Sequence, residues 1–246
     1  MKRLEQFIKL ANTTLQEREG NLPAPKIYCL QCDISKYFDS IDHRILLGLL
    51  ERKIRDKKVL WLINIILESS NKESGRGIPI GNLTSQLFAN VYLNELDQFV
   101  KHQLRLKYYL RYMDDFLILD FEKKKLHQIK EKIREFLQNK LKLELHPKKA
   151  NIFQIDKGID FLGYQIFVSD PTGRRPGGGI YRLLRKSTVK RFIKRTRAYQ
   201  KRLKQELMSC EKFNNSLQSW LAYAEHGNSW RLRKNLSEKL KVKLIK

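Results

Sequence analysis

Two adjacent aspartates interrupt a run of apolar and aromatic residues in LRYMDDFLIL, residues 110–119. Successive side chains of a straight strand point to opposite faces, so Asp114 and Asp115 could act together only at a tight turn between two strands. The flanking Tyr, Leu, Phe and Ile favour such strands. Carboxylates gathered at one hairpin tip repel each other unless cations neutralise them, and Mg²⁺ prefers such oxygen ligands. The pair is therefore either half of a metal site or a solvated turn.

A third acid is needed for a two-metal site, and Asp33 is the candidate. It lies in the apolar segment IYCLQCDI (27–34), which predicts a strand whose end can emerge beside the hairpin. Two ions about 3.5–4 Å apart would activate a nucleophile and hold the leaving oxygen of a phosphoryl displacement. Asp39 and Asp42 fall where a helix begins, so we expect them to act as helix caps.

The spacing of apolar residues predicts the elements that must position these acids. Strands are expected on both sides of the acid pair and over residues 27–34, 142–145, 151–155 and 159–168. Helices are expected over residues 2–18, 41–50, 57–69, 84–104 and 122–140, with a glycine-punctuated loop at 70–83. Three more helices are expected over 186–208, 211–226 and 229–243. The front of the chain is therefore α+β, and the tail is helical.

The chain is strongly basic. Its 246 residues carry a formal net charge of +24, and after residue 170 there are 21 Lys and Arg against 4 Asp and Glu. This balance indicates a polyanionic partner, most simply nucleic acid, because cationic side chains release counterions from phosphates. A basic surface kept for solubility is the alternative, and the uneven distribution of the charge weakens it.

Cysteine usage and hydropathy indicate the compartment. Three cysteines, an odd number, favour a reducing environment without a disulfide framework. Cys29 and Cys32 have C-x-x-C spacing, but their extended apolar segment favours strand residues over zinc ligands. No apolar run reaches membrane-spanning length, and the first residues lack a signal-peptide core. We therefore expect a cytoplasmic protein with no membrane partner.

The acid pair belongs to a set of motifs that resembles the reverse transcriptases. YMDD (112–115) resembles their catalytic box, and CDISKYFDSIDH (32–43) resembles their first aspartate motif. GIPIGNLTSQLFANVYLNELD (77–97) is similar to the loop and helix that position template and nucleotide. LELHPKKANIF (143–153) resembles the lysine-bearing motif, and IDFLGYQI (159–166) the primer-grip hairpin. The motifs occur in the family's order, which makes the set far more specific than any single box.

One motif also indicates a subtype. In reverse transcriptases, the loop-and-helix motif usually resembles Q-G-x-x-x-S-P. This chain has Ile80-Gly81-Asn82-Leu83-Thr84-Ser85-Gln86 at this position. That I-G-x-x-x-S-Q form resembles the enzymes of diversity-generating retroelements, which copy a template RNA into cDNA with errors concentrated at adenines. Reverse transcriptases of group II introns and retrons are the nearest alternatives.

The resemblance implies an RNA-directed DNA polymerase that uses two Mg²⁺ ions, or Mn²⁺ in their place. Asp33 and Asp114 would bridge the ions, Asp115 would be the third carboxylate, and the backbone carbonyl of Ile34 could add a ligand. Lys148 or Lys149 would match the lysine that protonates the pyrophosphate leaving group, and the sequence does not choose between them.

The resemblance also implies binding roles. Phe38, five residues after Asp33, matches a steric gate that would crowd a ribose 2′-OH, and this register favours the gate over the alternative of a plain core aromatic. Gly81 would allow a close backbone approach to nucleotide or template, and Ser85 and Gln86 would lie near the templating pair. Ser85 and Gln86 could also be first-turn helix residues without a base contact. The primer grip would be formed by Phe161, Leu162, Gly163 and Tyr164.

The implied fold is a right-hand polymerase with most of the fingers missing. We expect residual fingers and a connecting helix at 1–26, a palm at 27–168, a linker at 169–180 and a helical basic thumb at 181–246. Cations on the first thumb helix would follow the backbone of a nucleic-acid duplex; they are Lys186, Lys190, Arg191, Lys194, Arg195, Arg197 and Lys201.

The expected partners are template RNA, the cDNA/RNA duplex, dNTPs and, for the diversity-generating type, a small basic accessory protein. Only 32 residues precede Asp33, which is shorter than the family's fingers, so reduced nucleotide affinity is expected. Two other functions stay open: a catalytically weak chain that binds RNA through its thumb, and a metal-dependent nuclease. The order of the motifs argues against the nuclease.

Overall fold

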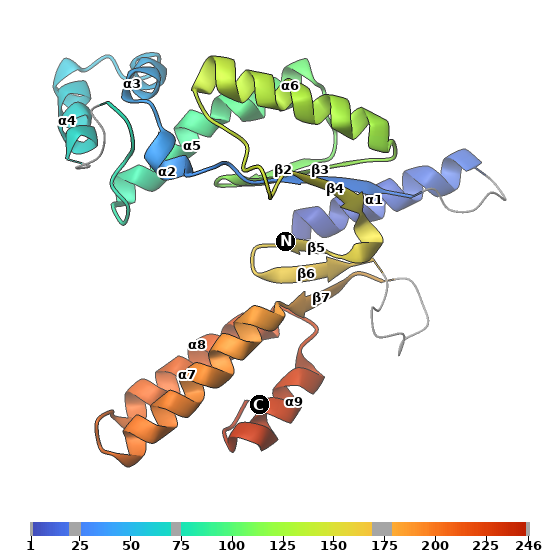
Figure 1. Cartoon of the computed structure of the whole chain (residues 1–246), viewed down its shortest axis with the longest axis vertical. Helices are drawn as coiled ribbons and strands as arrows, with labels where there is room; N and C mark the ends of the chain where they lie inside the picture. The colour runs from blue at the N-terminus through green and yellow to red at the C-terminus, as the bar shows by residue number, and fades with distance from the viewer. Residues whose placement is uncertain (1, 20–25, 70–74, 169–178, 245–246) are drawn as a thin grey trace. The chain divides into compact units, whose positions relative to one another are not determined.

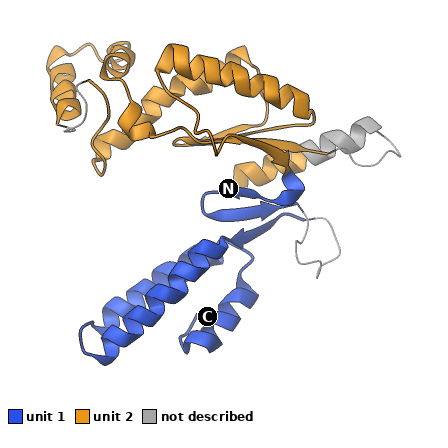
Figure 2. Ribbon diagram, in the orientation of Figure 1, with its two compact units in different colours: residues 1, 155–246 blue, residues 2–154 orange. Residues whose placement is uncertain are grey.

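The computed structural model describes residues 2–19, 26–69, 75–168 and 179–244, with the backbone alone for 11–19 (Figure 1). The chain forms two compact units, Lys2–Gln154 and Ile155–Lys246 (Figure 2). Each unit has its own apolar core. The three candidate metal ligands belong to the first unit.

A four-stranded antiparallel sheet forms the centre of the first unit, with its strands in the order β2-β3-β1-β4. The strands are β1 (Tyr28–Cys32), β2 (Tyr109–Tyr112), β3 (Asp115–Asp120) and β4 (Asn151–Gln154). The predicted strand–turn–strand around the acid pair is therefore present, and it lies beside β1. Cys29 and Cys32 are fully buried strand residues, as the apolar segment predicts.

Both faces of this sheet are covered. Four consecutive residues of β3, Phe116 to Leu119, are almost fully buried, although their side chains alternate between the two faces. The helix α6 (Lys123–Leu141) contacts β1, β3 and β4 with an apolar stripe of Leu126, Ile129, Ile133, Leu137 and Leu141. Figure 1 shows α6 and α1 (Lys2–Glu19) on opposite sides of the sheet. Leu4 and Ile8 of α1 are fully buried.

Helices between β1 and β2 complete the first core. They are α2 (Tyr37–Ser40), α3 (His43–Glu51), α4 (Lys57–Glu68) and α5 (Leu83–Gln98), followed by a π-helical turn, η1 (Phe99–Gln103). The carboxylate of Asp42 accepts from the backbone N–H groups of Arg44 and Ile45 at the start of α3, so its predicted capping role is confirmed. Asp39 instead lies inside α2.

The second unit joins a small sheet to three helices. The strands β5 (Ile159–Phe161), β6 (Tyr164–Phe167) and β7 (Tyr181–Leu184) are antiparallel in that order, after a 3₁₀ turn, η2 (Ile155–Lys157). The helices are α7 (Lys186–Lys204), α8 (Cys210–Glu225) and α9 (Trp230–Leu240). The ring of Phe192 in α7 stacks on Trp220 in α8 at 3.8 Å between centroids. The tail is thus helical as predicted, with one strand that the pattern did not indicate.

Three expected boundaries differ. The predicted strand at 142–145 is only an isolated bridge between Leu145 and Ile34, because Lys142 takes a left-handed conformation that ends α6. The predicted helix at 84–104 changes to the π-helical turn after Gln98. We expected the first domain to extend to residue 168, but β6 pairs with β7, so β5 and β6 belong to the second unit.

Most of the expected linker, residues 169–178, lies outside the described residues. None of the described helices combines the length and the apolar character needed to cross a bilayer.

Candidate active site

The turn between β2 and β3 displays the acid pair. Tyr112 and Asp115 are the last paired residues of the hairpin, so Met113 and Asp114 form its two-residue tip. Met113 has a φ of 55°, in the left-handed region that tight hairpin turns require. This conformation costs a non-glycine residue roughly 1–2 kcal/mol, which neighbouring contacts must offset. The two aspartates therefore stand at one end of the hairpin rather than on opposite faces of a long strand.

The end of β1 brings the third acid to the same edge of the sheet. Cys32 pairs with Phe116, so Asp33 follows one member of this pair and Asp115 precedes the other. Because β1 and β3 are antiparallel, both residues extend beyond the last pair at the same end. The structure thus brings Asp33 to the same edge as Asp114 and Asp115, which follow it by 81 and 82 positions in the sequence.

A crossing segment carries a lysine to this edge. The backbone N–H of His146 donates to the carbonyl of Asp33 at 2.8 Å, and Ser35 N–H donates to the carbonyl of Glu144 at 2.8 Å. A turn closed by a bond from Lys149 N–H to the His146 carbonyl follows at 3.1 Å. It directs the Lys149 ammonium to Oδ2 of Asp33, 2.5 Å away. Both lysine side chains are exposed, and it is the ion pair of Lys149 with Asp33 that favours Lys149 of the two candidates.

These charged groups affect one another. Burial raises the pKa of Asp114, the turn's own backbone N–H lowers it, and the negative charge of Asp33 raises it again, so the net pKa lies above its usual value. The pKa of Lys149 is raised, chiefly by its hydrogen bond to Asp33 and also by the charges of Asp115 and Asp114. The site therefore combines three carboxylates with one ammonium that offsets only part of their negative charge.

The donor chemistry of this edge suits a hard divalent cation. Three carboxylates are the ligand type that Mg²⁺ and Mn²⁺ prefer, and the Asp33 carboxylate already has a cationic group against it. In the conformation described, no three acidic, histidine or cysteine side chains among the described residues stand close enough to hold an ion. Binding of an ion would therefore require side-chain rotations that bring the carboxylates closer together, and displacement of the Lys149 ammonium from Asp33.

Ile34 and Phe38 lie just beyond Asp33. The two hydrogen bonds that flank the Ile34–Leu145 bridge use the backbone of Asp33 and Ser35, so neither occupies the Ile34 carbonyl. Phe38 is half-buried, packs against the core and contacts the ring of Tyr37 edge-on at 5.6 Å. Its carbonyl accepts from Ile78 N–H at 2.9 Å, which ties the following loop to α2. Phe38 is thus partly a core residue, and its partly exposed ring stays a predicted steric gate.

The loop before α5 holds the subtype residues. Gly81 has a φ of +93°, and a Cβ placed on it would meet no atom within 4 Å. Glycine is therefore needed here for its backbone conformation rather than for packing. The hydroxyl of Ser85 is buried and donates to the carbonyl of Pro79 at 2.5 Å, so Ser85 fixes the loop. Gln86 is exposed in the first turn of α5, where it could contact a base.

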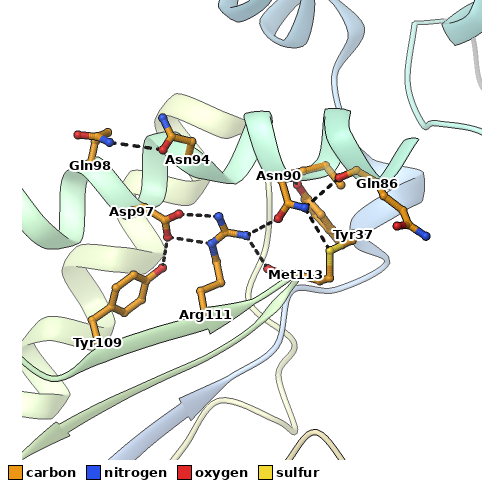
Figure 3. A network of polar contacts seen from close by, with 10 residues as sticks. Tyr37, Gln86, Asn90, Asn94, Asp97, Gln98, Tyr109, Arg111 and Met113 are labelled. Carbon is orange, nitrogen blue, oxygen red and sulfur yellow. Dashed lines mark hydrogen bonds and ion pairs between the residues drawn. The ribbon is translucent and has the colours of Figure 1, made fainter. Parts of the chain in front are cut away.

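A polar network joins α5 to the β2–β3 hairpin (Figure 3). The guanidinium of Arg111 in β2 donates to both carboxylate oxygens of Asp97 in α5, at 2.8 and 2.5 Å, and Tyr109 donates to Asp97 at 2.7 Å. Burial lowers the pKa of Arg111, but the hydrogen bonds and charge of Asp97 outweigh it, so the net pKa is raised. Neither Arg111 nor Asp97 was predicted as a site residue, although Arg111 lies in the segment 110–119 and Asp97 ends the motif 77–97.

The sequence signal for this network was a single cation, Arg111, in an otherwise apolar strand segment. Arg111 stands between Leu110 and Tyr112 in a predicted strand, and such a cation must find a buried partner. The partner, Asp97, is 14 positions away on a helix. Sequence spacing alone could not connect the two residues.

The residues resembling a primer grip form the β5–β6 hairpin of the second unit. Leu162 and Gly163 make its tip, with φ of 51° and 88°. The hydroxyl of Tyr164 donates to the carbonyl of Tyr223 at 2.7 Å, and the Tyr223 hydroxyl donates to the carbonyl of Gly163 at 2.8 Å. Phe161 is buried. The hairpin is thus held on α8, and its primer-binding role stays a prediction.

The cations predicted to follow a duplex all lie on α7 and are all exposed: Lys186, Lys190, Arg191, Lys194, Arg195, Arg197 and Lys201. The opposite face of the helix buries Phe192 and Thr196. The helix is therefore amphipathic as predicted, with one apolar and one cationic face.

Comparison with known proteins identifies the family. Residues 2–166 match the family model described as "Reverse transcriptase (RNA-dependent DNA polymerase)". The chain belongs to the reverse transcriptase family. The match includes the hairpin with Asp114 and Asp115, the strand that ends at Asp33, and the turn with Lys149.

Individual relatives agree with this family. Protein YkfC of Escherichia coli (strain K12) is 27% identical over 198 residues, covering 65% of this chain and 50% of its own. The group II intron-encoded protein LtrA of Lactococcus lactis subsp. cremoris is 30% identical over 205 residues, covering 55% of this chain and 34% of its own. The chain therefore spans half the length, or less, of these curated relatives.

Solved structures support the fold. Telomerase of Candida tropicalis bound to a fragment of telomeric RNA superposes with a TM-score of 0.52 at 14% identity, covering 71% of this chain and 34% of its own. The apo telomerase truncated from its C-terminal domain gives a TM-score of 0.51 at 15% identity, covering 68% and 38%. The predicted α+β class, with helices packed on an antiparallel sheet, is confirmed and is consistent with a polymerase palm.

Proposed function

We propose that this chain is an RNA-directed DNA polymerase that extends a primer on an RNA template by metal-dependent nucleotidyl transfer. One observation carries the proposal: Asp33, Asp114 and Asp115 stand at the same end of the sheet, with the Lys149 ammonium on Asp33. Membership of the reverse transcriptase family agrees with this chemistry. A solvated turn pair would need neither the third acid nor the lysine.

Each charged residue has a role in the proposed reaction. Asp33, Asp114 and Asp115, with the Ile34 carbonyl, would hold two Mg²⁺ ions. The ions, when bound, lower the pKa of the primer 3′-hydroxyl and neutralise the triphosphate. The 3′-oxygen forms a bond to the α-phosphorus, its proton passes to solvent, and the bond from that phosphorus to the β-phosphate oxygen breaks. Lys149 donates a proton to the departing pyrophosphate.

Other described residues select and hold the substrates. The exposed part of the Phe38 ring excludes the 2′-OH of a ribonucleotide. Gly81 lets the backbone approach the nucleotide or template, and Gln86 presents an amide to the templating base. In the second unit, the β5–β6 hairpin contacts the primer, and the cationic face of α7 contacts the phosphates of the duplex.

For the subtype, we propose an enzyme of a diversity-generating retroelement. The Ile80-to-Gln86 segment supports this proposal. Gln86 is exposed, and it stands at the position where the usual family motif ends in proline. An amide can donate and accept hydrogen bonds, so a contact from Gln86 would shift the template base and raise the error rate. Such an enzyme works with a small basic accessory protein. The identity to the intron-encoded protein of Lactococcus lactis favours the rival subtype, a group II intron enzyme.

Primer extension tests both the proposed polymerase activity and the proposed subtype. A DNA primer is annealed to an RNA template containing all four bases and incubated with the chain, dNTPs and Mg²⁺, and the products are sequenced. Extension establishes the polymerase, and errors concentrated at template adenines establish the subtype. Extension with evenly distributed errors would support the intron type. RNA binding without extension would support the RNA-binding alternative.

A further inference from the structure

Arg111 makes more contacts than its ion pair with Asp97 requires. Its Nε and Nη2 atoms bind the carboxylate, and the remaining nitrogen, Nη1, donates to the carbonyl of Met113 at 3.0 Å (Figure 3). Met113 is the first residue of the hairpin tip and directly precedes Asp114. The same guanidinium therefore binds a helix on one side and the catalytic turn on the other.

Asn90 of α5 completes the connection. Its Oδ1 accepts from Arg111 Nη1 at 3.4 Å, and its Nδ2 lies 3.6 Å from the sulfur of Met113. The same Nδ2 donates to the carbonyl of Gln86 at 3.1 Å, one helical turn earlier. The network thus joins the first turn of α5, where Gln86 is exposed, to the tip that carries Asp114.

The helix side of this network is well packed. Ser85, Phe88, Ala89, Tyr92, Leu93 and Leu96 are all buried in α5. The hydroxyl of Tyr37 also donates to the carbonyl of Ala89 at 2.5 Å, in the buried turn next to Asn90. The hairpin tip, by contrast, is a two-residue turn with a non-glycine residue at a φ of 55°. A strained turn keeps its position only if its surroundings hold it there.

We propose that Arg111 is a positioning residue that fixes the Met113–Asp114 turn against α5, with Asn90 as its second anchor. This inference rests on the proposed polymerase function, because the turn matters through the placement of Asp114. Arg111 touches neither the nucleotide nor the metal ions in this proposal. It fixes the position of Asp114 relative to Asp33. It also couples that position to α5, the helix in which Gln86 is exposed.

Arginine is suited to this task, and lysine is not. The planar guanidinium presents donors in fixed directions, so one group can bind a carboxylate with two nitrogens and a carbonyl with the third. An ammonium at the same position could keep the charge of the pair but not both sets of hydrogen bonds. Arg111→Lys should therefore separate the positioning role from simple charge neutralisation.

The test compares Arg111→Lys and Asn90→Ala with a matched control, Arg52→Lys. Arg52 also pairs with a carboxylate on α5, Glu95 at 3.3 Å, but it is exposed and has no contact with the hairpin in the network described. For each variant we would measure amide hydrogen exchange in a peptide covering residues 109–118. We would also measure the turnover rate kcat, the KM for dNTP and the Kd for a primer–template duplex.

Arg111→Lys is expected to raise exchange at the tip at least about tenfold and to lower kcat about 10–100-fold, since a displacement of about 1 Å can cost 100-fold. The duplex Kd should stay within about twofold of the native value. Asn90→Ala, at an exposed position, should cause smaller changes of the same kind, about 3–10-fold. Arg52→Lys should change none of these quantities.

Native exchange at the tip in both variants, or native kcat despite faster exchange, would overturn the proposal. If Arg111→Lys loosens the whole first unit, exchange rises in every peptide of that unit. In that case the exchange at residues 109–118 and the kcat of Asn90→Ala decide whether the network positions the turn. If the native chain shows no synthesis, the polymerase proposal fails by itself. Local exchange at residues 109–118 still tells whether Arg111 holds the turn.

Discussion

The ammonium of Lys149 lies 2.5 Å from Oδ2 of Asp33, although the two residues are 116 positions apart in the sequence. The contact depends on the crossing of two segments, in which His146 N–H donates to the Asp33 carbonyl and the following turn directs Lys149 back. The side chain of Lys149 is 58% exposed and that of Asp33 is 15% exposed. The ion pair therefore contributes little to the stability of the fold, about 0–1 kcal/mol. Its value is therefore expected in catalysis.

Lys149→Met should lower the rate of nucleotide addition about 100-fold or more, because loss of a general acid typically costs 10²–10⁴-fold. Lys148→Met should retain most of the rate, since the ammonium that contacts Asp33 belongs to Lys149. Single-turnover extension by one nucleotide measures both variants, with thermal unfolding to confirm that neither loses its fold. Equal losses in the two variants would contradict the assignment to Lys149.

Phe38→Ala should increase the incorporation of ribonucleotides relative to deoxynucleotides at least about tenfold, because a smaller side chain admits the 2′-OH. The ring is also packed against the core, so the variant should lose some stability. Phe136→Ala is the matched control. Phe136 is half-buried and stacked on Phe99 at 4.2 Å, and its loss should lower stability without changing sugar selection. Unchanged selection in Phe38→Ala would mean that the ring is only a core residue.

Alanine should have opposite effects at two glycines of the first unit. Gly81 has a φ of +93°, so Gly81→Ala should destabilise by about 1–2 kcal/mol even though the new Cβ has room. Gly48 lies within α3 and also has room for a Cβ, so Gly48→Ala should stabilise by about 0.5–1 kcal/mol. Each kcal/mol should shift Tm by about 2–4 °C. A destabilised Gly48→Ala or a stabilised Gly81→Ala would contradict the local backbone geometry.

One cysteine should react with a thiol reagent in the native protein at pH 8. Cys210 is exposed, whereas Cys29 and Cys32 are buried in β1. Burial raises the pKa of both buried thiols, that of Cys32 to about 12, so almost no reactive thiolate forms at pH 8. Three thiols should react after denaturation. Rapid modification of two or three thiols without denaturant would show that the central strand is not buried as described.

Local patterns predicted much of the site. The strand–turn–strand around Asp114 and Asp115 follows from β-favouring residues on both sides of the two aspartates, and the strand before Asp33 follows from a mostly apolar run. The helices of the first unit follow similarly from apolar spacing, and the Asp42 cap follows from a short acid directly before a helix. These features depend on residues close together in the chain, which is why the sequence alone indicates them.

Contacts between distant segments could not be predicted in this way. The strand β7 has only four residues, and it is stabilised by pairing with β6 rather than by its own pattern. The choice of Lys149 over Lys148 depends on the turn that begins at His146. The pairing of Arg111 with Asp97 depends on the packing of α5 on β2, so each residue looked like an isolated charge in its own segment.

The most direct test of the account is the Mg²⁺ dependence of primer extension on an RNA template for the native chain, Asp114→Asn and Asp120→Asn. Asp120 is a matched control, because it ends the same strand β3 at its other end and pairs with Lys125 at 2.7 Å. We expect native and Asp120→Asn extension to rise with Mg²⁺ and to stop with a chelator, and Asp114→Asn extension to be at least about 100-fold slower at every Mg²⁺ concentration. Extension by Asp114→Asn at the native rate, or native extension that persists in the chelator, would contradict a metal-dependent polymerase site at the hairpin tip.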